Sequence, residues 1–514
     1  MTDDSNTTLR GGRDRTGDSE HSRRSFLRAT AGVGAVAAGL GGLAGGAVAA
    51  HDDAELSRLR RDGNRIVDAE GEPVDLHGVN IADPKRVDVT APARGRDAVQ
   101  TIDLATDADS GWHANVVRLP VQPVDIGEHQ PGSGPEPVAF DEDQLESYLS
   151  NHLDAAVEKC REEGAYAIVD YHRHRDIPWT DETLSEEVTM FWEIVADHYA
   201  DEDHVIFEVF NEPQGNPHYG INGQELVDWW GTWREAAQPW VDTIRAAADN
   251  FTLVGSPRFS QATFGAVIEE FDGADLGYTL HLYPAHGPTT PADYDSFVTP
   301  PGSDDEEAPY DDATPAHEIA PVFMSEWGYD PEGGPAAGGG VTKAAADSAA
   351  WAEHDPNYGE NLTEWLATRP VHSTAWCFDP LWQPRVFERP FEVEATGNPY
   401  APDNEVPELA PERPADWSLL GGDYQGVLVR DFVAEQSGVP AEELPGMEGV
   451  PRDIDDDGQW EDLNGNGRVD YGDVETLVDV QDSDWAQSHS DELDFDGDGA
   501  LTEDDVLALY FESL

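Results

Sequence analysis

Short apolar runs alternate with longer amphipathic stretches along the chain from residue 63 onward. The apolar runs have the length and composition of buried β-strands. Eight of them stand out, at residues 74–80, 114–120, 165–172, 205–211, 251–255, 277–283, 321–326 and 372–378. Helical periodicity fills several of the intervals, for example at 141–164 and 223–249. Strands that are apolar almost throughout and that alternate with helices predict a parallel sheet covered on both faces.

Two architectures are compatible with this alternation. A (β/α)8 TIM barrel accommodates eight such strands in roughly 370 residues with loop insertions. A doubly wound open sheet is the rival, and a Gly-rich phosphate-binding turn after the first strand would favour it. The residues that follow the first strand, HGVNIADPKR at 77–86, contain no such turn. We therefore predict an α/β fold, a TIM barrel, for residues 51–436.

Polar and aromatic side chains collect at or near one end of these predicted strands. They are Arg118, His172, Asn211, Glu212, His281, Tyr283, Glu326 and Trp376. Each one alone has an ordinary explanation, such as a surface ion pair, a core histidine or a polar strand end closed by a turn. Nothing structural, however, requires all eight to gather at the same end. In a barrel the carboxyl ends of the strands meet at one rim, where active sites are built.

The ordered set of strand ends resembles glycoside hydrolase family 5. The segments that carry the resemblance are NVVRLP, DYH, FEVFNEP, HLY, SEWG and the late Trp376. Residues 63–80 resemble the opening of that family and residues 416–432 its closing segment, so the resemblance covers roughly residues 60 to 436. Asn-Glu-Pro alone is weak evidence because short motifs recur by chance. Gln214 departs from the family pattern and affects no catalytic assignment.

The resemblance implies a role for each of these residues. Glu212 would be the general acid/base and Glu326 the nucleophile of a retaining mechanism, which needs carboxyl groups about 5–5.5 Å apart. Arg118 would hold Glu326 as the anion and Tyr283 would hydrogen-bond it. The remaining substrate contacts would come from Asn211 on the sugar 2-hydroxyl, from His172 and His281, and from Trp376 stacking on a pyranose. Glu208 would be structural, and catalysis would need no cofactor.

The family acts on several β-glycans, and the combination of FEVFNEP, HLYP and a late Trp is most similar to its cellulases. We therefore expect an endo-β-1,4-glucanase that acts on a cellulose-like β-glucan. The nearest alternative is a β-mannanase or another β-glycan endohydrolase of the family. A non-catalytic glycan-binding surface protein is a further alternative, and it would be expected to lack one of the two glutamates. Four tryptophans could extend the stacking platform, namely Trp179, Trp229, Trp230 and Trp382, although the helical pair 229–230 is better explained by packing.

The charge of the chain restricts its partners and its environment. It has 105 acidic and 30 basic residues, a formal net charge of −75, yet 39% hydrophobic residues supply a core. Such a surface repels itself in dilute buffer, and near 1 M salt the screening length falls to about 3 Å. We expect a halophilic source and a monomer. The charge disfavours nucleic acid and anionic membranes and leaves a neutral polysaccharide as a plausible partner.

The first 50 residues have the pattern of a twin-arginine signal peptide. SRRSFLR at 22–28 precedes an Ala/Gly-rich stretch that ends in AVAA at 47–50. A transmembrane anchor is the alternative, but Ala and Gly make a poor span. We expect a secreted, extracellular protein with no membrane span in the mature chain. Its two cysteines, Cys160 and Cys377, do not form a disulfide scaffold, and the sequence leaves open whether they are bonded.

After a linker at 437–452, residues 453–514 repeat a calcium-loop pattern. Oxygen-bearing side chains recur at fixed offsets around a glycine at position six, which is how paired EF-hand-type loops are built. The predicted ligands are Asp462, Asn464, Asn466, Asp470 and Asp473 in the first loop, and Asp494, Asp496, Asp498 and Asp505 in the second. Asp in place of Glu at position twelve resembles dockerin modules. The resemblance implies a small all-α dockerin-like domain that binds calcium, with a cohesin-like protein as a possible partner. A solvated acidic surface is the alternative.

Overall fold

The computed structural model describes most of residues 56–437 and part of the C-terminal segment. The described residues are 56–130, 134–173, 178–213, 224–284, 290–300, 314–330, 357–388, 400 and 414–437, followed by 459–461, 463, 469, 471–481, 486, 489–490, 493–495 and 501–512.

Eight parallel strands form a closed barrel, which confirms the predicted fold. The strands are β3 (His77–Asn80), β4 (Val116–Val121), β5 (Tyr166–Tyr171), β6 (Val205–Glu208), β7 (Thr252–Val254), β8 (Leu276–Leu282), β9 (Val322–Trp327) and β10 (Val371–Ala375). They follow one another around the barrel in chain order, and β10 closes it by pairing with β3. Every residue of these strands is buried, as their nearly continuous apolar sequences require.

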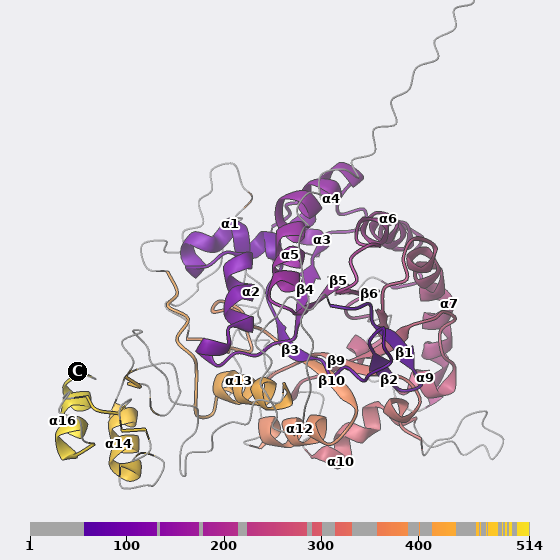
Figure 1. Ribbon diagram of the computed structural model, residues 1–514. Helices are drawn as coiled ribbons and strands as arrows, with labels where there is room; N and C mark the ends of the chain where they lie inside the picture. The colour runs from indigo at the N-terminus through magenta and orange to yellow at the C-terminus, as the bar shows by residue number, and fades with distance from the viewer. Residues whose placement is uncertain are drawn as a thin grey trace, which may run out of the picture. The chain divides into compact units, whose positions relative to one another are not determined.

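Helices surround the strands (Figure 1). The longer ones are α1 (Pro84–Arg94), α2 (Ala98–Thr106), α4 (Glu142–Tyr148), α5 (Asp154–Glu162), α6 (Glu182–His198), α7 (Gln224–Ala247), α12 (Tyr358–Ala367) and α13 (Gln425–Gln436). Short turns of helix are α3 (Pro123–Ile126), α8 (Pro257–Ser260), α9 (Gly265–Ile268) and α10 (Pro291–Tyr294). The helical patterns at 141–164 and 223–249 are confirmed, although a π-helical turn at Leu149–Leu153 separates α4 from α5.

A hairpin that the sequence reading did not predict lies at the amino-terminal end of the barrel. Its strands β1 (Arg60–Asp62) and β2 (Arg65–Val67) pair antiparallel. Leu59 and Ile66 from the hairpin join an apolar cluster with Val116, Ile206 and other residues from the beginnings of the barrel strands. This packing closes the end of the barrel opposite the predicted catalytic rim and contributes a core separate from the one between strands and helices.

The tryptophans and cysteines of the barrel serve its packing. Trp230, Trp233 and Trp240 of α7 are fully buried, and Trp233 and Trp240 donate their indole N–H groups to Gly255 O and Ser185 Oγ. Cys160 and Cys377 are both free and buried. The question left open by the sequence is therefore answered, because no bond joins the two thiols.

Two helices are described in the C-terminal segment, α14 (Tyr471–Val480) and α16 (Glu503–Glu512). They share a small apolar core to which Leu463, Leu477, Leu493 and Leu509 contribute. Each helix begins near the end of one of the two predicted calcium loops. Among the described residues, no helix combines the length and apolar character needed to cross a membrane.

Candidate active site

The predicted catalytic residues meet at the carboxyl end of the barrel strands. Arg118 lies in β4, His281 in β8 and Glu326 in β9, while Glu212 follows β6 by four residues. Strands β8 and β9 shift register between Thr279 and His281, and beyond the shift His281 pairs directly with Glu326. This irregularity places the imidazole beside the carboxylate of the neighbouring strand.

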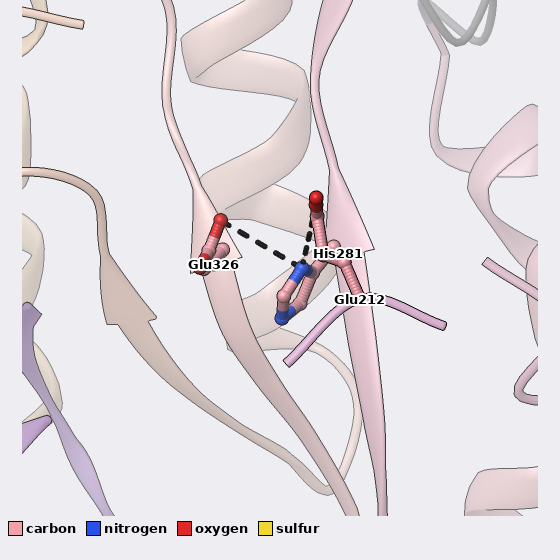
Figure 2. Close-up of side chains that lie close together, drawn as sticks. All are labelled: Glu212, His281 and Glu326. Carbon is pink, nitrogen blue, oxygen red and sulfur yellow. Dashed lines mark hydrogen bonds and ion pairs between the residues drawn. The ribbon is translucent and has the colours of Figure 1, made fainter. Parts of the chain in front are cut away.

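Glu212 and Glu326 face one another across His281 (Figure 2). One side-chain oxygen of each glutamate and one ring nitrogen of His281 all lie within 4.8 Å of one another. The Glu212 side chain is 17% exposed and that of Glu326 is 6% exposed, so solvent reaches both carboxyl groups. The separation suits a retaining glycosidase, in which the two carboxyl groups lie about 5–5.5 Å apart.

Both oxygens of Glu326 accept hydrogen bonds that favour its charged form. Arg118 Nη1 donates to Oε1 at 2.7 Å and the Tyr283 hydroxyl donates to Oε2 at 2.8 Å. Burial raises the pKa of Glu326, and the Arg118 charge, then His172 and then these two hydrogen bonds limit that rise. Arg118 and Tyr283 therefore favour the charged, carboxylate form of Glu326.

Glu212 lacks the two donors that bind Glu326, and its pKa is raised more strongly. Its Oε1 lies 3.2 Å from Nδ1 of His281. Burial, and then repulsion from Glu326, raise the pKa of Glu212 well above its ordinary value. Two facing carboxyl groups whose environments differ in this way are suited to separate roles, one as acid and one as anion.

Arg118 also binds groups that the sequence reading did not identify. Its guanidinium lies 2.9 Å from Asp170 Oδ2 and 2.7 Å from Glu208 Oε2, and it donates to Asn80 Oδ1 at 3.0 Å. Burial raises the pKa of Asp170 and of Glu208 to about 7 despite this partner. Asp170 could have been found, since it lies two residues before His172 in an extended segment and therefore shares its face. Glu208 has a structural role, because its carboxylate holds Arg118 against β6.

The other predicted substrate contacts lie around this pair. Asn211 is buried, and its Oδ1 accepts from Arg118 Nη2 at 2.8 Å. The His172 ring stacks on Trp376 with centroids 5.5 Å apart and an angle of 6°. His172 Nδ1 lies 2.7 Å from Asp170 Oδ2, and burial lowers the pKa of His172 to about 3. The imidazole is therefore neutral at neutral pH.

The four additional tryptophans divide into two groups. Trp382 packs against Trp376 with ring centroids 5.5 Å apart, so it can extend that platform. Trp179 packs edge-on against Trp229. Trp230 is 1% exposed and donates its indole N–H to Glu269 O, so it belongs to the core.

A metal ion is an alternative occupant of this site. Among the described residues, the potential ligand atoms of Glu212, His281 and Glu326 are close enough together to hold one. The two oxygens of Glu326 are already bound by Arg118 and Tyr283. We therefore interpret the cluster as a catalytic pair with its histidine.

The predicted calcium ligands are described only in part. Asp473 and Asp505 are buried at the start of α14 and in α16, and Asp494 is described without a regular element. Asp505 Oδ2 accepts a hydrogen bond from the Thr502 amide at 2.6 Å. The remaining predicted ligands lie outside the described residues: Asp462, Asn464, Asn466, Asp470, Asp496 and Asp498.

Comparisons with known proteins identify the family of the barrel. A family model described as cellulase (glycosyl hydrolase family 5) matches residues 67–380. An endoglucanase of Halalkalibacter akibai is 28% identical over 230 residues, 44% of this chain and 27% of that protein. Endoglucanase C of Evansella cellulosilytica is 25% identical over 353 residues, 65% of this chain and 37% of that protein. The chain thus spans less than half the length of either relative.

A solved structure shares the fold. The crystal structure of a β-glucanase from Saccharophagus degradans superposes with a TM-score of 0.52 at 20% identity, covering 74% of this chain and 94% of that one. The barrel and its facing carboxyl pair, together with the family match, define a glycoside hydrolase. The chain belongs to glycosyl hydrolase family 5.

Proposed function

We propose that the protein is a retaining endo-β-1,4-glucanase that cleaves β-glucan chains by double displacement. The observation that carries the proposal is the facing pair of Glu212 and Glu326, which lie within 4.8 Å and differ in the groups that bind them. The relatives described above are named endoglucanases, which supports β-1,4-glucan as the substrate class. Because the chain spans only part of those relatives, its activity and substrate are proposed here and are not taken over from them.

The first chemical step forms a covalent glycosyl-enzyme. The Glu326 carboxylate attacks the anomeric carbon, and the bond to the leaving sugar breaks as Glu212 gives its proton to the leaving oxygen. In the second step Glu212, now a carboxylate, takes a proton from water. The water oxygen attacks the anomeric carbon and releases Glu326, so the product keeps the original configuration and the enzyme returns to its starting state.

The other residues would bind and orient the sugar. Asn211, held by Arg118, would contact the 2-hydroxyl group, a contact that strengthens in the transition state. Neutral His172 would orient a further hydroxyl, and Trp376, stacked beside it, would border the sugar ring. His281, between the glutamates, would position Glu212.

Hydrolysis of two soluble polymers in molar salt separates the candidate substrates. We expect reducing sugar to be released from carboxymethylcellulose and not from galactomannan. The reverse result would support the β-mannanase alternative. Binding of either polymer without any hydrolysis would support the glycan-binding alternative and contradict the proposal.

Two variants test the roles of the glutamates separately. Glu326→Gln removes the nucleophile, so turnover should fall by at least about 10⁴-fold, and added azide should not restore it. Glu212→Ala should keep activity on aryl glycosides whose leaving group needs no proton, and azide should accelerate it. Circular dichroism should show unchanged folding, and full activity of either variant would refute the corresponding role.

We also propose that residues 453–514 form a dockerin-like, calcium-binding domain with a cohesin-like protein as its partner. The loop spacing and the two packed helices support this idea. Isothermal titration of the whole chain with calcium should show two sites. The double variant Asp473→Ala/Asp505→Ala, which loses position twelve of both loops, should lose that heat. Equal heats for the two proteins would assign the binding to the acidic surface instead.

Secretion through the twin-arginine pathway is the final part of the proposal. Arg23 and Arg24 form the pair that precedes the apolar stretch. Replacing both by Lys should keep the protein inside the cell with its first 50 residues attached. Undiminished export of that variant would contradict the proposal. A halophilic source follows from the charge and is tested below through stability.

A further inference from the structure

A chain of buried polar groups connects Glu208 to the acid/base Glu212. Ser325 Oγ donates to Glu208 Oε1 at 2.9 Å. Ser325 Oγ also lies 2.9 Å from His281 Nε2. On the other side of the ring, His281 Nδ1 lies 3.2 Å from Glu212 Oε1. Glu208, Ser325 and His281 are each 0% exposed. Double displacement assigns no step to Glu208 or Ser325, so their place in this chain calls for an explanation.

The direction of the hydrogen bonds fixes where the protons lie. A serine hydroxyl has one proton, and Ser325 gives it to Glu208. Its oxygen can therefore only accept from His281, which places the imidazole proton on Nε2. In a neutral imidazole the other nitrogen then has a lone pair and no proton. With His281 neutral, the proton in the contact between its Nδ1 and Glu212 then belongs to the Glu212 carboxyl group.

We propose that Glu208 and Ser325 are positioning residues that fix the tautomer of His281 and thereby keep Glu212 in its protonated form. This inference rests on the proposed role of Glu212 as acid/base. In the first step the protonated carboxyl is the required acid. After it has given up its proton, the Glu212 carboxylate faces the lone pair of Nδ1, which makes it a stronger base toward the attacking water.

Glu208 must be ionised for the chain to run in this direction. Arg118 Nε donates to its other oxygen, Oε2, at 2.7 Å, which favours the carboxylate. Thr279 Oγ1 donates to Oε1 at 3.2 Å and thus strengthens the same preference. Glu208 therefore acts as the fixed acceptor at one end of this series of hydrogen bonds.

Other charged and titratable groups face Glu212 and His281 and act through space. They are Arg118 on β4, Asp170 on β5, His172 after it, Tyr283 after β8 and Glu326 on β9. Glu326, Asp170 and Glu208 raise the pKa of Glu212 and Arg118 lowers it, whichever tautomer His281 adopts. A test of the tautomer must therefore leave these charges in place, and Ser325 meets that condition because it carries none.

The pH profile of Ser325→Ala measures the effect of the chain. Without the hydroxyl, His281 is free to carry its proton on Nδ1 and to donate it to the Glu212 carboxylate. The alkaline limb of kcat/KM should then move to lower pH by about one unit. Ser325→Thr keeps the hydroxyl and should restore the wild-type limb. Thr279→Val is the matched control. It removes a hydroxyl donor from the same Glu208 oxygen, but Thr279 does not connect Glu208 to His281.

A second pair of variants tests the direction of the chain. In Glu208→Gln the amide oxygen should turn toward Arg118 and the amide nitrogen toward Ser325, which reverses every hydrogen bond as far as Glu212. Asp170→Asn also removes one negative charge beside Arg118 but leaves the chain intact. The alkaline limb should therefore move further in Glu208→Gln than in Asp170→Asn. Equal shifts in the two variants would overturn the proposal, as would a Thr279→Val shift as large as that of Ser325→Ala.

Nitrogen NMR of the wild-type protein reads the tautomer of His281 directly. The protein is labelled with ¹⁵N-histidine, and the signal of His281 among the 17 histidines is identified by its loss in His281→Gln. At about pH 8, above the pKa of about 7 of Glu208, we expect the proton on Nε2. A proton on Nδ1 in an active enzyme would overturn the proposed role of Glu208 and Ser325 but not the proposed function. A wild-type protein with Nε2–H that hydrolyses no β-glycan would instead contradict the proposed function.

Discussion

Arg118 is the residue on which the electrostatics of the site depends most. Its guanidinium lies within 2.9 Å of three carboxylates, those of Asp170, Glu208 and Glu326. A planar group with five donors can bind several acceptors at once, whereas an ammonium is a compact point charge. This residue therefore stabilises the Glu326 carboxylate and also neutralises buried acids that would otherwise be costly.

Removing this charge should cost both stability and activity. We expect Arg118→Met to lower the free energy of unfolding by about 3–5 kcal/mol, since it leaves buried carboxylates without a partner. Denaturant unfolding in molar salt measures the change. The loss should be smaller below pH 7, where Asp170 and Glu208, whose pKa is about 7, become protonated. A loss that does not depend on pH would show that shape, and not charge, is the reason.

Asp170 should make stability depend on pH. Burial raises the pKa of Asp170 from 3.8 to about 7 in the folded protein, so the folded state binds this proton more tightly than the unfolded chain. Its contribution to the free energy of unfolding therefore falls as pH rises from about 4 to about 7, by at most about 4 kcal/mol. The stability of Asp170→Asn should vary less over this range. Parallel pH profiles of the two proteins would contradict the assignment.

The residues that could be predicted from sequence are those that interrupt an apolar run at its end. Glu212 and Glu326 are visible in this way, and the ordered set of strand ends identifies the family. Ser325 and Asn80 could not be predicted to matter, because they are short polar residues within strands. Their partners come from other strands, as when Asn80 Nδ2 donates to Ser325 O at 2.9 Å. Such contacts exist only once the barrel has closed.

At the scale of elements, the closeness of neighbouring strands is what positions the side chains. At Gly78 in β3, an added Cβ would lie 1.8 Å from the backbone oxygen of Val116 in β4. These two residues are partners in the parallel pairing of β3 and β4. The glycine is therefore required by contact with the next strand and not by its own backbone conformation.

Two glycine substitutions should have opposite effects on stability. Gly78→Ala forces backbone apart at the pairing of β3 and β4, so it should lower the free energy of unfolding by about 1–3 kcal/mol or more. Gly231→Ala in the exposed middle of α7, where an added Cβ meets nothing within 4 Å, should raise it by about 0.5–1 kcal/mol. Thermal unfolding of both variants measures this. A tolerated Gly78→Ala would mean that the two strands can separate.

The type of each barrel element could be predicted because its period is strong, and the irregularities could not. The periodicity at 141–164 predicts one helix, but a π-helical turn at Leu149–Leu153 divides it. The hairpin at 60–67 was missed because its strands have three residues each and show too little alternation to recognise. The register shift between Thr279 and His281 depends on the neighbouring strand and leaves no local signal.

For the whole molecule, the net charge of −75 is the dominant feature. Mutual repulsion of the acidic surface disfavours the compact state, and salt screens it. We expect the denaturation midpoint to rise steeply between dilute buffer and molar NaCl, and activity to follow it. A neutral osmolyte at equal osmolality is the control and should have a much smaller effect. Equal stabilisation by both solutes would exclude screening as the cause.

The central claim is that Glu326 attacks the sugar while Glu212 supplies the proton. A 2-deoxy-2-fluoro cellobioside with a good leaving group slows the second step of a retaining enzyme and so lets the covalent intermediate accumulate. Mass spectrometry of the intact protein, followed by peptide mapping, should find one sugar attached at Glu326, and Glu326→Gln should remain unlabelled. A label on any other residue, or no label on a protein that hydrolyses β-glucan, would contradict the account.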